Sequence, residues 1–262
     1  LDYCIFEYGG GYSDNYGMIH LEDCEIAMQN STVTNSQSYG ISANNEAGFD
    51  EFTNNTVKDN ESNALSLYAN YAHTIGEVNN ITSDLGIRVR GDDVNESNPV
   101  WYPQDTYYLI AGDVEVGSES GTNLTIEAGT ELRFANNAAL YVGYRSGTFG
   151  NLKADGTADS PIIFTSASPE GSQSPGDWDF IWFDEGIGAA TIMNYCEVSY
   201  GGGYNDNYGA IHCSDTGTDK PVISNTTISY SGSYGISANS GSTPLLTSMS
   251  YSNNQQANED LN

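Results

Sequence analysis

Residues 3–20 read Tyr3-Cys4-Ile5-Phe6-Glu7-Tyr8-Gly9-Gly10-Gly11-Tyr12-Ser13-Asp14-Asn15-Tyr16-Gly17-Met18-Ile19-His20, and nearly the same residues return from Tyr195 to His212. The two copies lie 192 positions apart. Each is followed by a second matching phrase, residues 30–42 in the first copy and residues 225–237 in the later one, which has three additional residues before it. The chain therefore contains a long module that is present once and in part a second time.

A shorter period runs through the first 90 residues. Four similar phrases begin at Tyr16, Tyr39, Asn63 and Leu85, so that their starts advance by 23, 24 and 22 positions. A period in the low twenties, with short β-branched runs separated by Asn, Gly and Ser, is typical of a solenoid. Apolar residues keep helical spacing for no more than one turn, and the fixed leucines of leucine-rich repeats are missing. The sequence therefore predicts an all-β chain, a parallel β-helix of about 22–28 residues per coil.

In such a fold, small or apolar side chains of successive coils point inward and stack, and neighbouring coils supply the hydrogen bonds that one coil cannot make alone. The residues that we expect in this interior column are Val33, Ile41, Val57, Leu65, Ile81 and Ile87.

Residues 91–99 form a polar, acidic break that is typical of a loop between two modules. We therefore expect residues 1–95 to be the C-terminal half of one β-helix module, and residues 96–262 to be the following module, incomplete at its end. Unpaired edge strands recruit other chains, so further copies of the module, joined covalently or end to end, are the expected partners.

The phrases after this break follow a characteristic order. They are Trp101-x-Pro103, Gly112-Asp113-Val114-x-Val116, Leu124-Thr125-Ile126, Leu152-x-Ala154-x-Gly156-Thr157, Pro161-Ile162-x-Phe164-Thr165 and Gly176-Asp177-Trp178, ahead of Tyr195-Cys196. In this order they resemble the right-handed parallel β-helix proteins of the pectin-lyase-like superfamily, and more narrowly the large modular surface and secreted proteins of bacteria and archaea. The resemblance covers about residues 100–240, with residues 1–90 as the second half of a preceding module. It implies a right-handed β-helix, but the superfamily holds lyases, hydrolases, adhesins and structural shafts, so it does not imply one activity.

The charge limits the partners that the chain can bind. Thirty-five Asp and Glu residues stand against seven Lys and Arg residues, a formal net charge of -28. Nucleic acid and anionic membranes are therefore poor partners, while cations, neutral glycans and protein surfaces remain possible. No run approaches the roughly 20 apolar residues of a membrane span, so we expect no membrane insertion. Abundant Tyr, Asn, Ser, Thr and Gly favour an extracellular or cell-surface location.

A catalytic interpretation depends on few residues. The lyases that the chain resembles use an Arg or Lys base beside aspartates that hold calcium over a uronate, and Arg88 and Arg90 near Asp92 and Asp93 are the best candidates of this kind. The structural alternative is that these arginines balance an acidic surface. His20 and His212 follow Asp14 and Asp206 by six positions, but one Asp per copy does not form the carboxylate pair of a hydrolase. We expect no catalytic residue.

Calcium is the one cofactor that the composition favours, because hard cations take oxygen ligands from Asp, Asn and loop carbonyls. The candidate ligands are Asp14, Asp206, Asp92 and Asp93. The alternative is that these are solvated acids that keep a long solenoid soluble.

Each copy of the repeated segment also carries three tyrosines at a spacing of four. They are Tyr8, Tyr12 and Tyr16 in the first copy and Tyr200, Tyr204 and Tyr208 in the second. Such amphipathic rings stack on sugar rings or on a partner protein. The alternative is that they pack over the solenoid as part of the fold.

The four cysteines also fall in the repeated segment, two in each copy. If each pair lies on adjacent coils, the disulfides are Cys4–Cys24 and Cys196–Cys213. The alternative is four buried thiols, and the spacing within each pair is far wider than that of the cysteine pairs in zinc sites.

The function that the sequence favours is therefore structural. We expect a non-catalytic repeat in the shaft of an extracellular or cell-surface fibre, sheath or adhesin. The alternative is a carbohydrate-binding or carbohydrate-active β-helix that acts like a polysaccharide lyase.

Overall fold

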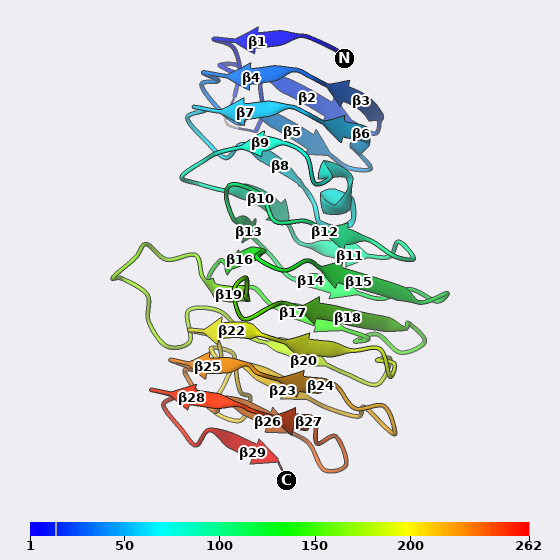
Figure 1. Ribbon diagram of the computed structural model, residues 1–262, viewed down its shortest axis with the longest axis vertical. Helices are drawn as coiled ribbons and strands as arrows, with labels where there is room; N and C mark the ends of the chain where they lie inside the picture. Colours follow the sequence, from blue (N-terminus) through cyan, green and yellow to red (C-terminus); the bar gives the residue numbers. More distant parts are fainter. Residues whose placement is uncertain (14, 262) are drawn as a thin grey trace.

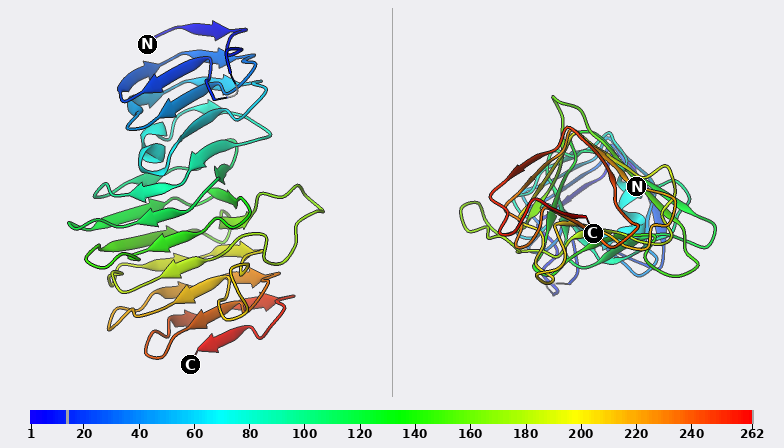
Figure 2. Two further views of the ribbon diagram at one scale, coloured as in Figure 1. Left: turned by 180° about the vertical axis from the view of Figure 1, so that it is seen from behind. Right: turned by 90° about the horizontal axis from the view of Figure 1, so that it is seen from below.

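The computed structural model describes residues 1–13 and 15–261, in which short β-strands wind into a parallel solenoid of about 10 turns (Figure 1). Viewed along its axis, the solenoid has a roughly triangular outline, with the coils stacked one below another (Figure 2). Every strand pairing between coils is parallel. The predicted all-β parallel β-helix is therefore confirmed.

One sheet, here called the long sheet, runs from the first coil to the last in the order β2-β5-β8-β10-β13-β16-β19-β22-β25-β28. Its strands are β2 (Ile19–Glu22), β5 (Ile41–Asn44), β8 (Leu65–Tyr68), β10 (Ile87–Arg90), β13 (Tyr108–Ile110), β16 (Glu131–Phe134), β19 (Ile162–Ser166), β22 (Cys196–Ser199), β25 (Thr227–Ser229) and β28 (Ser250–Ser252). Two further sheets flank it in the first coils. The four-stranded sheet contains β1 (Ile5–Glu7), β4 (Thr32–Thr34), β7 (Thr56–Lys58) and β9 (Asn80–Ile81), and the two-stranded sheet contains β3 (Glu25–Gln29) and β6 (Gly48–Thr53).

In the later coils, two other sheets complete the solenoid. The seven-stranded sheet contains β11 (Asp92–Val94), β14 (Val114–Val116), β17 (Leu140–Val142), β20 (Ile181–Phe183), β23 (Ile211–Cys213), β26 (Ile236–Ala238) and β29 (Glu259–Leu261). The six-stranded sheet contains β12 (Val100–Trp101), β15 (Thr122–Ile126), β18 (Gly150–Asp155), β21 (Ile192–Asn194), β24 (Val222–Ser224) and β27 (Leu245–Thr247). A 3-10 helix, η1 (Ala69–Ile75), stands between β8 and β9, and within the described residues no helix is long and apolar enough to cross a membrane.

The interior of the solenoid is a set of in-register apolar columns. Val33, Val57 and Ile81 face one another on β4, β7 and β9, and each is 0% exposed. Burial of one such side chain contributes about 1.5–3 kcal/mol. All six predicted core residues are at most 1% exposed, so this prediction is confirmed.

The coils vary in length more than predicted. Register partners in the first coils keep the period of the sequence phrases, as for Ile19 with Ile41 and Ile41 with Leu65. Leu140, however, pairs with Ile181, so the coil between them is much longer than the predicted range. The additional residues leave the stacked strands as loops, such as the one between β19 and β20, part of which protrudes (Figure 1). Loops of this kind are accommodated because only the strand positions must return to register.

Pairs of residues with positive φ, five positions apart, bend the chain at both ends of short strands. The pairs are Tyr3 and Tyr8, Asn30 and Asn35, Asn54 and Asp59, Tyr195 and Tyr200, Asn225 and Tyr230, and Ser248 and Asn253. Asn and Asp tolerate this left-handed conformation better than other residues with a side chain. This requirement explains why many of the repeated phrases start and end on Asn or Asp.

The Tyr-Gly step of the repeated phrases has a steric reason. A Cβ at Gly40 would lie 2.6 Å from the carbonyl oxygen of Ala64 in the next coil, and a Cβ at Gly235 would lie 2.6 Å from that of Asn258. Only glycine therefore permits the coils to approach at this corner.

The two copies of the module occupy different faces of the solenoid. β1 of the first copy lies in the four-stranded sheet, but its counterpart β22 lies in the long sheet. β2 lies in the long sheet, whereas its counterpart β23 lies in the seven-stranded sheet. The second copy is thus displaced by one face around the axis relative to the first. The division of the chain at residue 95 into two modules stays a prediction, since the long sheet continues across it.

The predicted disulfides are absent, and all four cysteines are free thiols. Cys196 lies on β22 in the long sheet and Cys213 on β23 in the seven-stranded sheet, so the two residues are on different faces instead of on adjacent coils of one face. Cys4 precedes β1 and Cys24 precedes β3, which also belong to different sheets. The thiols are not all buried either, because Cys24 is exposed and Cys4 is partly exposed. Burial raises the pKa of Cys196 and of Cys213 to about 12.

Side-chain amides connect the coils at one corner. Asn55 Oδ1 accepts the Ser31 N–H at 3.0 Å, and Asn55 Nδ2 donates to the Met28 carbonyl at 2.8 Å. In the next coil, Asn79 Oδ1 accepts the Asn55 N–H at 3.0 Å. Asn55 is 1% exposed, so water cannot replace these bonds.

We expect the substitution Asn55→Ala to lower the free energy of unfolding by about 1–3 kcal/mol, because it leaves a buried N–H and a buried carbonyl without partners. Urea denaturation followed by circular dichroism measures this loss. The control Asn136→Ala changes an exposed turn residue and should alter the free energy by less than about 0.5 kcal/mol. Equal stability of the two variants would contradict the role of the corner amide.

Candidate ligand-binding faces

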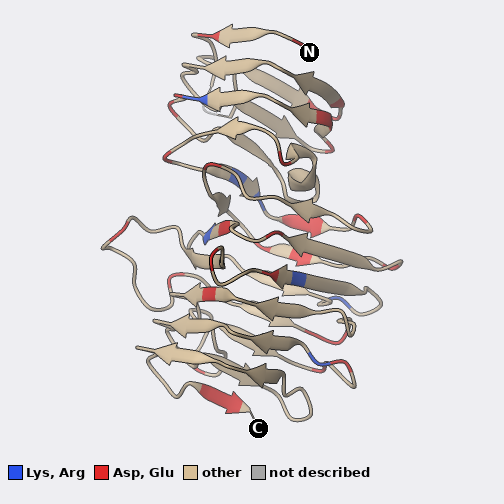
Figure 3. Ribbon diagram, in the orientation of Figure 1, with Lys and Arg blue, Asp and Glu red and all other residues tan. Residues whose placement is uncertain are grey.

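Acidic residues are distributed along the whole solenoid, whereas Lys and Arg occur at few places (Figure 3). Because the strands are parallel and in register, outward side chains of successive coils line up in columns on the surface. Two such columns carry the residues that could bind a ligand or take part in a reaction. One lies on β2, β5, β8 and β10 of the long sheet, and the other lies on β14, β17, β20 and β23 of the seven-stranded sheet.

The first column is polar. His20, Ser42, Ser66 and Arg88 lie in register, and Glu22, Asn44, Tyr68 and Arg90 form a parallel row beside them. We call these eight residues the polar face. It brings together the predicted arginines and one of the two predicted histidines.

Both arginines of the polar face form hydrogen bonds with residues of other coils. Arg88 Nη1 donates to the Tyr39 hydroxyl at 2.8 Å. Arg90 donates to Asn44 Oδ1 at 2.5 Å and to the Ala43 carbonyl, and its guanidinium lies 4.4 Å above the Tyr68 ring. Burial lowers the pKa of Arg90. The side chains reach back across two coils, so they tie strands together.

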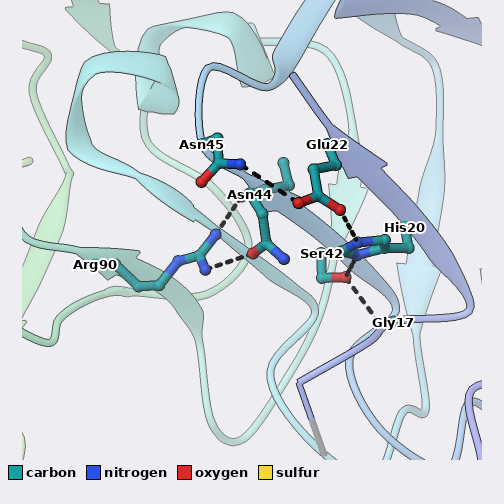
Figure 4. A network of polar contacts seen from close by, with 8 residues as sticks. Gly17, His20, Glu22, Ser42, Asn44, Asn45 and Arg90 are labelled. Atoms are coloured by element: carbon teal, nitrogen blue, oxygen red, sulfur yellow. Dashed lines mark hydrogen bonds and ion pairs between the residues drawn. The ribbon is translucent and has the colours of Figure 1, made fainter. Parts of the chain in front are cut away.

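His20 takes part in a hydrogen-bonded clip between coils. Ser42 Oγ accepts the Gly17 N–H at 2.8 Å and lies 2.8 Å from His20 Nδ1 (Figure 4). The direction of the hydrogen bond between Ser42 Oγ and His20 Nδ1 depends on the tautomer of the imidazole ring. Nε2 is 3.5 Å from Glu22 Oε2 and has no hydrogen-bond partner among the described residues.

This Ser–His–Glu arrangement resembles a hydrolytic triad only in its residue types. Ser42 is 1% exposed, so a substrate carbonyl cannot reach its hydroxyl. The second copy has the same clip, in which Ser237 Oγ accepts the Gly209 N–H at 2.7 Å and lies 2.7 Å from His212 Nδ1. There the position of Glu22 is occupied by Ser214. A clip that persists without the acid serves the fold.

A surface cleft of about 640 Å³ adjoins the polar face. Its lining residues are Asn45, Glu46, Tyr68, Asn70, Tyr71, Gly91, Asp92, Asp93 and Asn95. Two of the predicted calcium ligands, Asp92 and Asp93, thus lie together. Asp93, however, forms an ion pair with Arg145 Nη1 at 2.9 Å, and Arg145 Nε also pairs with Glu115 at 2.6 Å. A cation at Asp93 would have to displace this guanidinium.

Asp206, another predicted calcium ligand, does not line this cleft. Asp206 is exposed, and its carbonyl accepts hydrogen bonds from Ser233 Oγ at 3.0 Å and Gln256 Nε2 at 2.8 Å. Asp14 lies outside the described residues. Within the part of the chain that the structure describes, no group of three or more His, Cys, Asp or Glu side chains is arranged to hold a metal ion. Calcium binding stays a prediction.

The six predicted tyrosines do not form one surface in each copy. Tyr8 and Tyr12 are 78% and 89% exposed, and Tyr12 contacts Tyr16 with ring centroids 5.5 Å apart. In the second copy, Tyr200 stacks on Tyr230 at 5.1 Å near the end of β22. Tyr204 and Tyr208 instead lie over the seven-stranded sheet, stacked 5.6 Å apart.

The second column is aromatic. Tyr141, Trp182 and His212 are register partners on β17, β20 and β23, with ring centroids 5.9 Å apart for Tyr141 and Trp182 and 5.0 Å for Trp182 and His212. Further rings extend the cluster without a break. We call the whole set the aromatic face, which consists of Tyr141, Tyr144, Phe180, Trp182, Tyr204, Tyr208 and His212.

Sequence reasoning missed Tyr141, Tyr144, Phe180 and Trp182. These residues are far apart along the chain, and only the stacking of coils brings them together. A signal was present, however. Three strands share the pattern of an aromatic residue or histidine between two apolar ones: Leu140-Tyr141-Val142, Ile181-Trp182-Phe183 and Ile211-His212-Cys213. An aligned ladder of such triplets marks one outward column.

Three carboxylates border the aromatic face, and burial raises the pKa of each: Asp113, Asp179 and Asp184. Asp113 accepts the Ala139 N–H at 3.1 Å. Trp182 Nε1 donates to Ser214 Oγ at 2.8 Å, and Ser214 Oγ donates to Asp184 at 2.9 Å. The indole ring is therefore fixed in place by a polar chain.

The burial of His212 predicts that the free energy of unfolding depends on pH. Burial lowers its pKa to about 4, against about 6.5 for a histidine in an unfolded chain. Between these values the unfolded chain binds the additional proton, so the free energy of unfolding falls as the pH falls from about 6.5 to about 4. Relative to His212→Asn, the wild-type chain should lose about 3 kcal/mol over this interval.

Urea denaturation of both chains at several pH values measures this difference. Asp113, Asp179 and Asp184 titrate in both chains, so the comparison isolates the histidine. A wild-type advantage that stays constant from pH 7 to pH 4 would show that His212 is not buried in its neutral form.

The family follows from the comparison with known proteins. No curated protein and no solved structure matches the chain. Residues 93–232, more than half of the chain, match the family model of the pectate-lyase like beta helix domain. The match begins in β11 and continues past β25, over coils that carry the aromatic face. The chain therefore belongs to the pectate-lyase-like β-helix domain family.

Proposed function

We propose that this chain is a non-catalytic structural repeat, a β-helical scaffold in an extracellular or cell-surface fibre, sheath or adhesin. One observation carries the proposal. The residues that would have to catalyse a reaction instead connect one coil to another, and the histidine clip does so at equivalent positions of both copies.

Three properties support a scaffold. The interior is a continuous column of buried apolar residues from the first coils to the last. The corner amides and the histidine clips add side-chain hydrogen bonds between coils. The high negative charge keeps such an elongated surface soluble. Together these features favour a stiff rod that presents repeated surfaces.

The module repeat supports further copies of the module as partners, joined covalently or end to end. Parallel coils add to one another through the same backbone hydrogen bonds that hold one chain together. Because the second copy is displaced by one face, equivalent surfaces of successive copies point in different directions around the axis. A fibre built in this way presents each surface on more than one side.

One observation favours a second candidate, a uronate-binding lyase. The cleft of about 640 Å³ is lined by Asp92 and Asp93 and also by Tyr68, whose ring contacts Arg90. This places an arginine and two carboxylates beside one opening. The arginines would have to leave their partners Tyr39 and Asn44 to act as a base.

An eliminase assay separates the two candidates. With polygalacturonate and calcium, we expect the purified chain to form no unsaturated product, measured by ultraviolet absorbance. Arg88→Ala should instead lower the free energy of unfolding by about 1 kcal/mol, because Tyr39 loses a charged hydrogen-bond donor. The control Lys153→Ala removes an exposed cation and should change the stability by less than about 0.5 kcal/mol. Turnover by the wild-type chain that Arg88→Ala abolishes would establish the lyase.

A separate experiment tests the proposed extracellular or cell-surface location of the protein. In intact cells that produce the protein, an antibody against this chain should label the surface, or the protein should be recovered from the medium. A cytoplasmic marker serves as the control for lysis. Labelling that requires permeabilised cells would contradict the extracellular scaffold.

A further inference from the structure

The aromatic face is a preformed surface with accessible rings. Tyr144 and Tyr204 are 41% and 55% exposed, and Trp182 and Tyr208 are partly exposed. Beneath them, Phe180 is fully buried and contacts Trp182 at 5.1 Å and Tyr204 at 5.4 Å. A ligand would thus meet rings whose positions are already set by a packed layer, which lowers the entropic cost of binding.

A carboxylate acceptor lies at the same place. Asp179 is 8% exposed, and among the described residues its carboxylate receives no hydrogen bond. Burial is the main reason why the pKa of the Tyr141 hydroxyl is raised, and the charges of Asp113 and Asp179 raise it further. The two carboxylates therefore lie near Tyr141, at the aromatic face. The Asp179 oxygens are not fully enclosed, so the carboxylate faces solvent and can accept hydrogen bonds from the hydroxyl groups of a ligand.

The charges at the face exclude an acidic ligand. No Lys or Arg takes part in the described ring contacts of the aromatic face. Arg145 follows Tyr144 in the sequence, but its guanidinium is paired with Asp93 and Glu115. A uronate would therefore meet carboxylates without a compensating cation, whereas a neutral ligand would not be repelled.

We propose that the aromatic face binds a neutral oligosaccharide, whose sugar rings stack on Tyr144, Trp182 and Tyr204 while its hydroxyl groups donate to Asp113 and Asp179. A sugar ring has an apolar face of C–H groups and a rim of hydroxyls, which matches rings bordered by acceptors. This binding activity goes beyond the scaffold function and does not depend on it. It also differs from the cleft beside Arg90, which lies on other strands.

The first copy repeats the core of this arrangement. Tyr12, Tyr16 and His20 are the counterparts of Tyr204, Tyr208 and His212, and Tyr16 contacts both Tyr12 at 5.5 Å and His20 at 4.4 Å. The ring contacts of the repeated segment therefore recur at a different face of the solenoid. The part of the aromatic face formed by Tyr204, Tyr208 and His212 therefore belongs to the repeated segment.

Tryptophan fluorescence provides a specific readout. Trp101 and Trp178 are 1% and 0% exposed, so Trp182 is the tryptophan that a bound ligand can contact. The probes are cellohexaose, mannohexaose and xylohexaose, with hexagalacturonate as the anionic probe. We expect at least one neutral probe to give a saturable change in fluorescence, confirmed by calorimetry, and hexagalacturonate to give none.

Variants then locate the binding. Tyr204→Ala and Tyr144→Ala each remove an exposed ring, and each should weaken binding about tenfold. Asp179→Asn should also weaken it, because an amide is a poorer acceptor than a carboxylate. The matched control Tyr230→Ala removes a 39% exposed tyrosine that stacks on Tyr200 and should leave the affinity unchanged. Circular dichroism confirms that each variant is folded.

Three results would overturn the proposal. The first is the lack of a saturable response to every neutral probe up to about 10 mM. The second is binding that Tyr204→Ala and Tyr144→Ala leave unchanged in folded protein. The third is self-association through the same rings, seen as a concentration-dependent change in fluorescence without sugar that Tyr204→Ala abolishes.

Discussion

Every strand in this chain is too short to be stable alone, and its backbone hydrogen bonds go to the coils before and after it. This constraint governs the rest of the structure. Each coil must return the chain to the same lateral position, so fewer residue types are tolerated at the corners than in the strands. Asn30 and Asn35 bend the chain with positive φ, Gly40 permits close approach, and Asn55 satisfies backbone groups at a corner.

The same constraint places side chains in columns. Inward columns stack apolar residues such as Val33, Val57 and Ile81, which hold the coils together from inside. Outward columns repeat one chemical type over several coils, which creates the polar face and the aromatic face. A column can serve structure and binding together, since Trp182 packs on Phe180 and still presents a partly exposed ring.

Burial decides which polar residues can act on a ligand. The clips around Ser42 and Ser237 are enclosed and repeated, and the arginines of the polar face are bound to neighbouring coils. Their hydrogen bonds join coils. Asp179 has no such partner in the described chain, although it is almost as buried. The contrast is between side chains that already bond to a neighbouring coil and a carboxylate that no described side chain or backbone group bonds.

The parallel β-helix, its coil spacing in the first 90 residues and its interior column could be predicted from the sequence, because each coil needs the same kinds of residue at the same positions. The sequence also determined the two copies of the module and the resemblance to pectin-lyase-like proteins. The face that each strand occupies could be seen only in the folded chain. The length of a loop does not alter the register of the strands, so spacing alone could not show that Cys196 and Cys213 lie on different sheets. Tyr141 and Trp182 are separated along the chain by β18, β19 and their loops, and became neighbours only when their coils stacked.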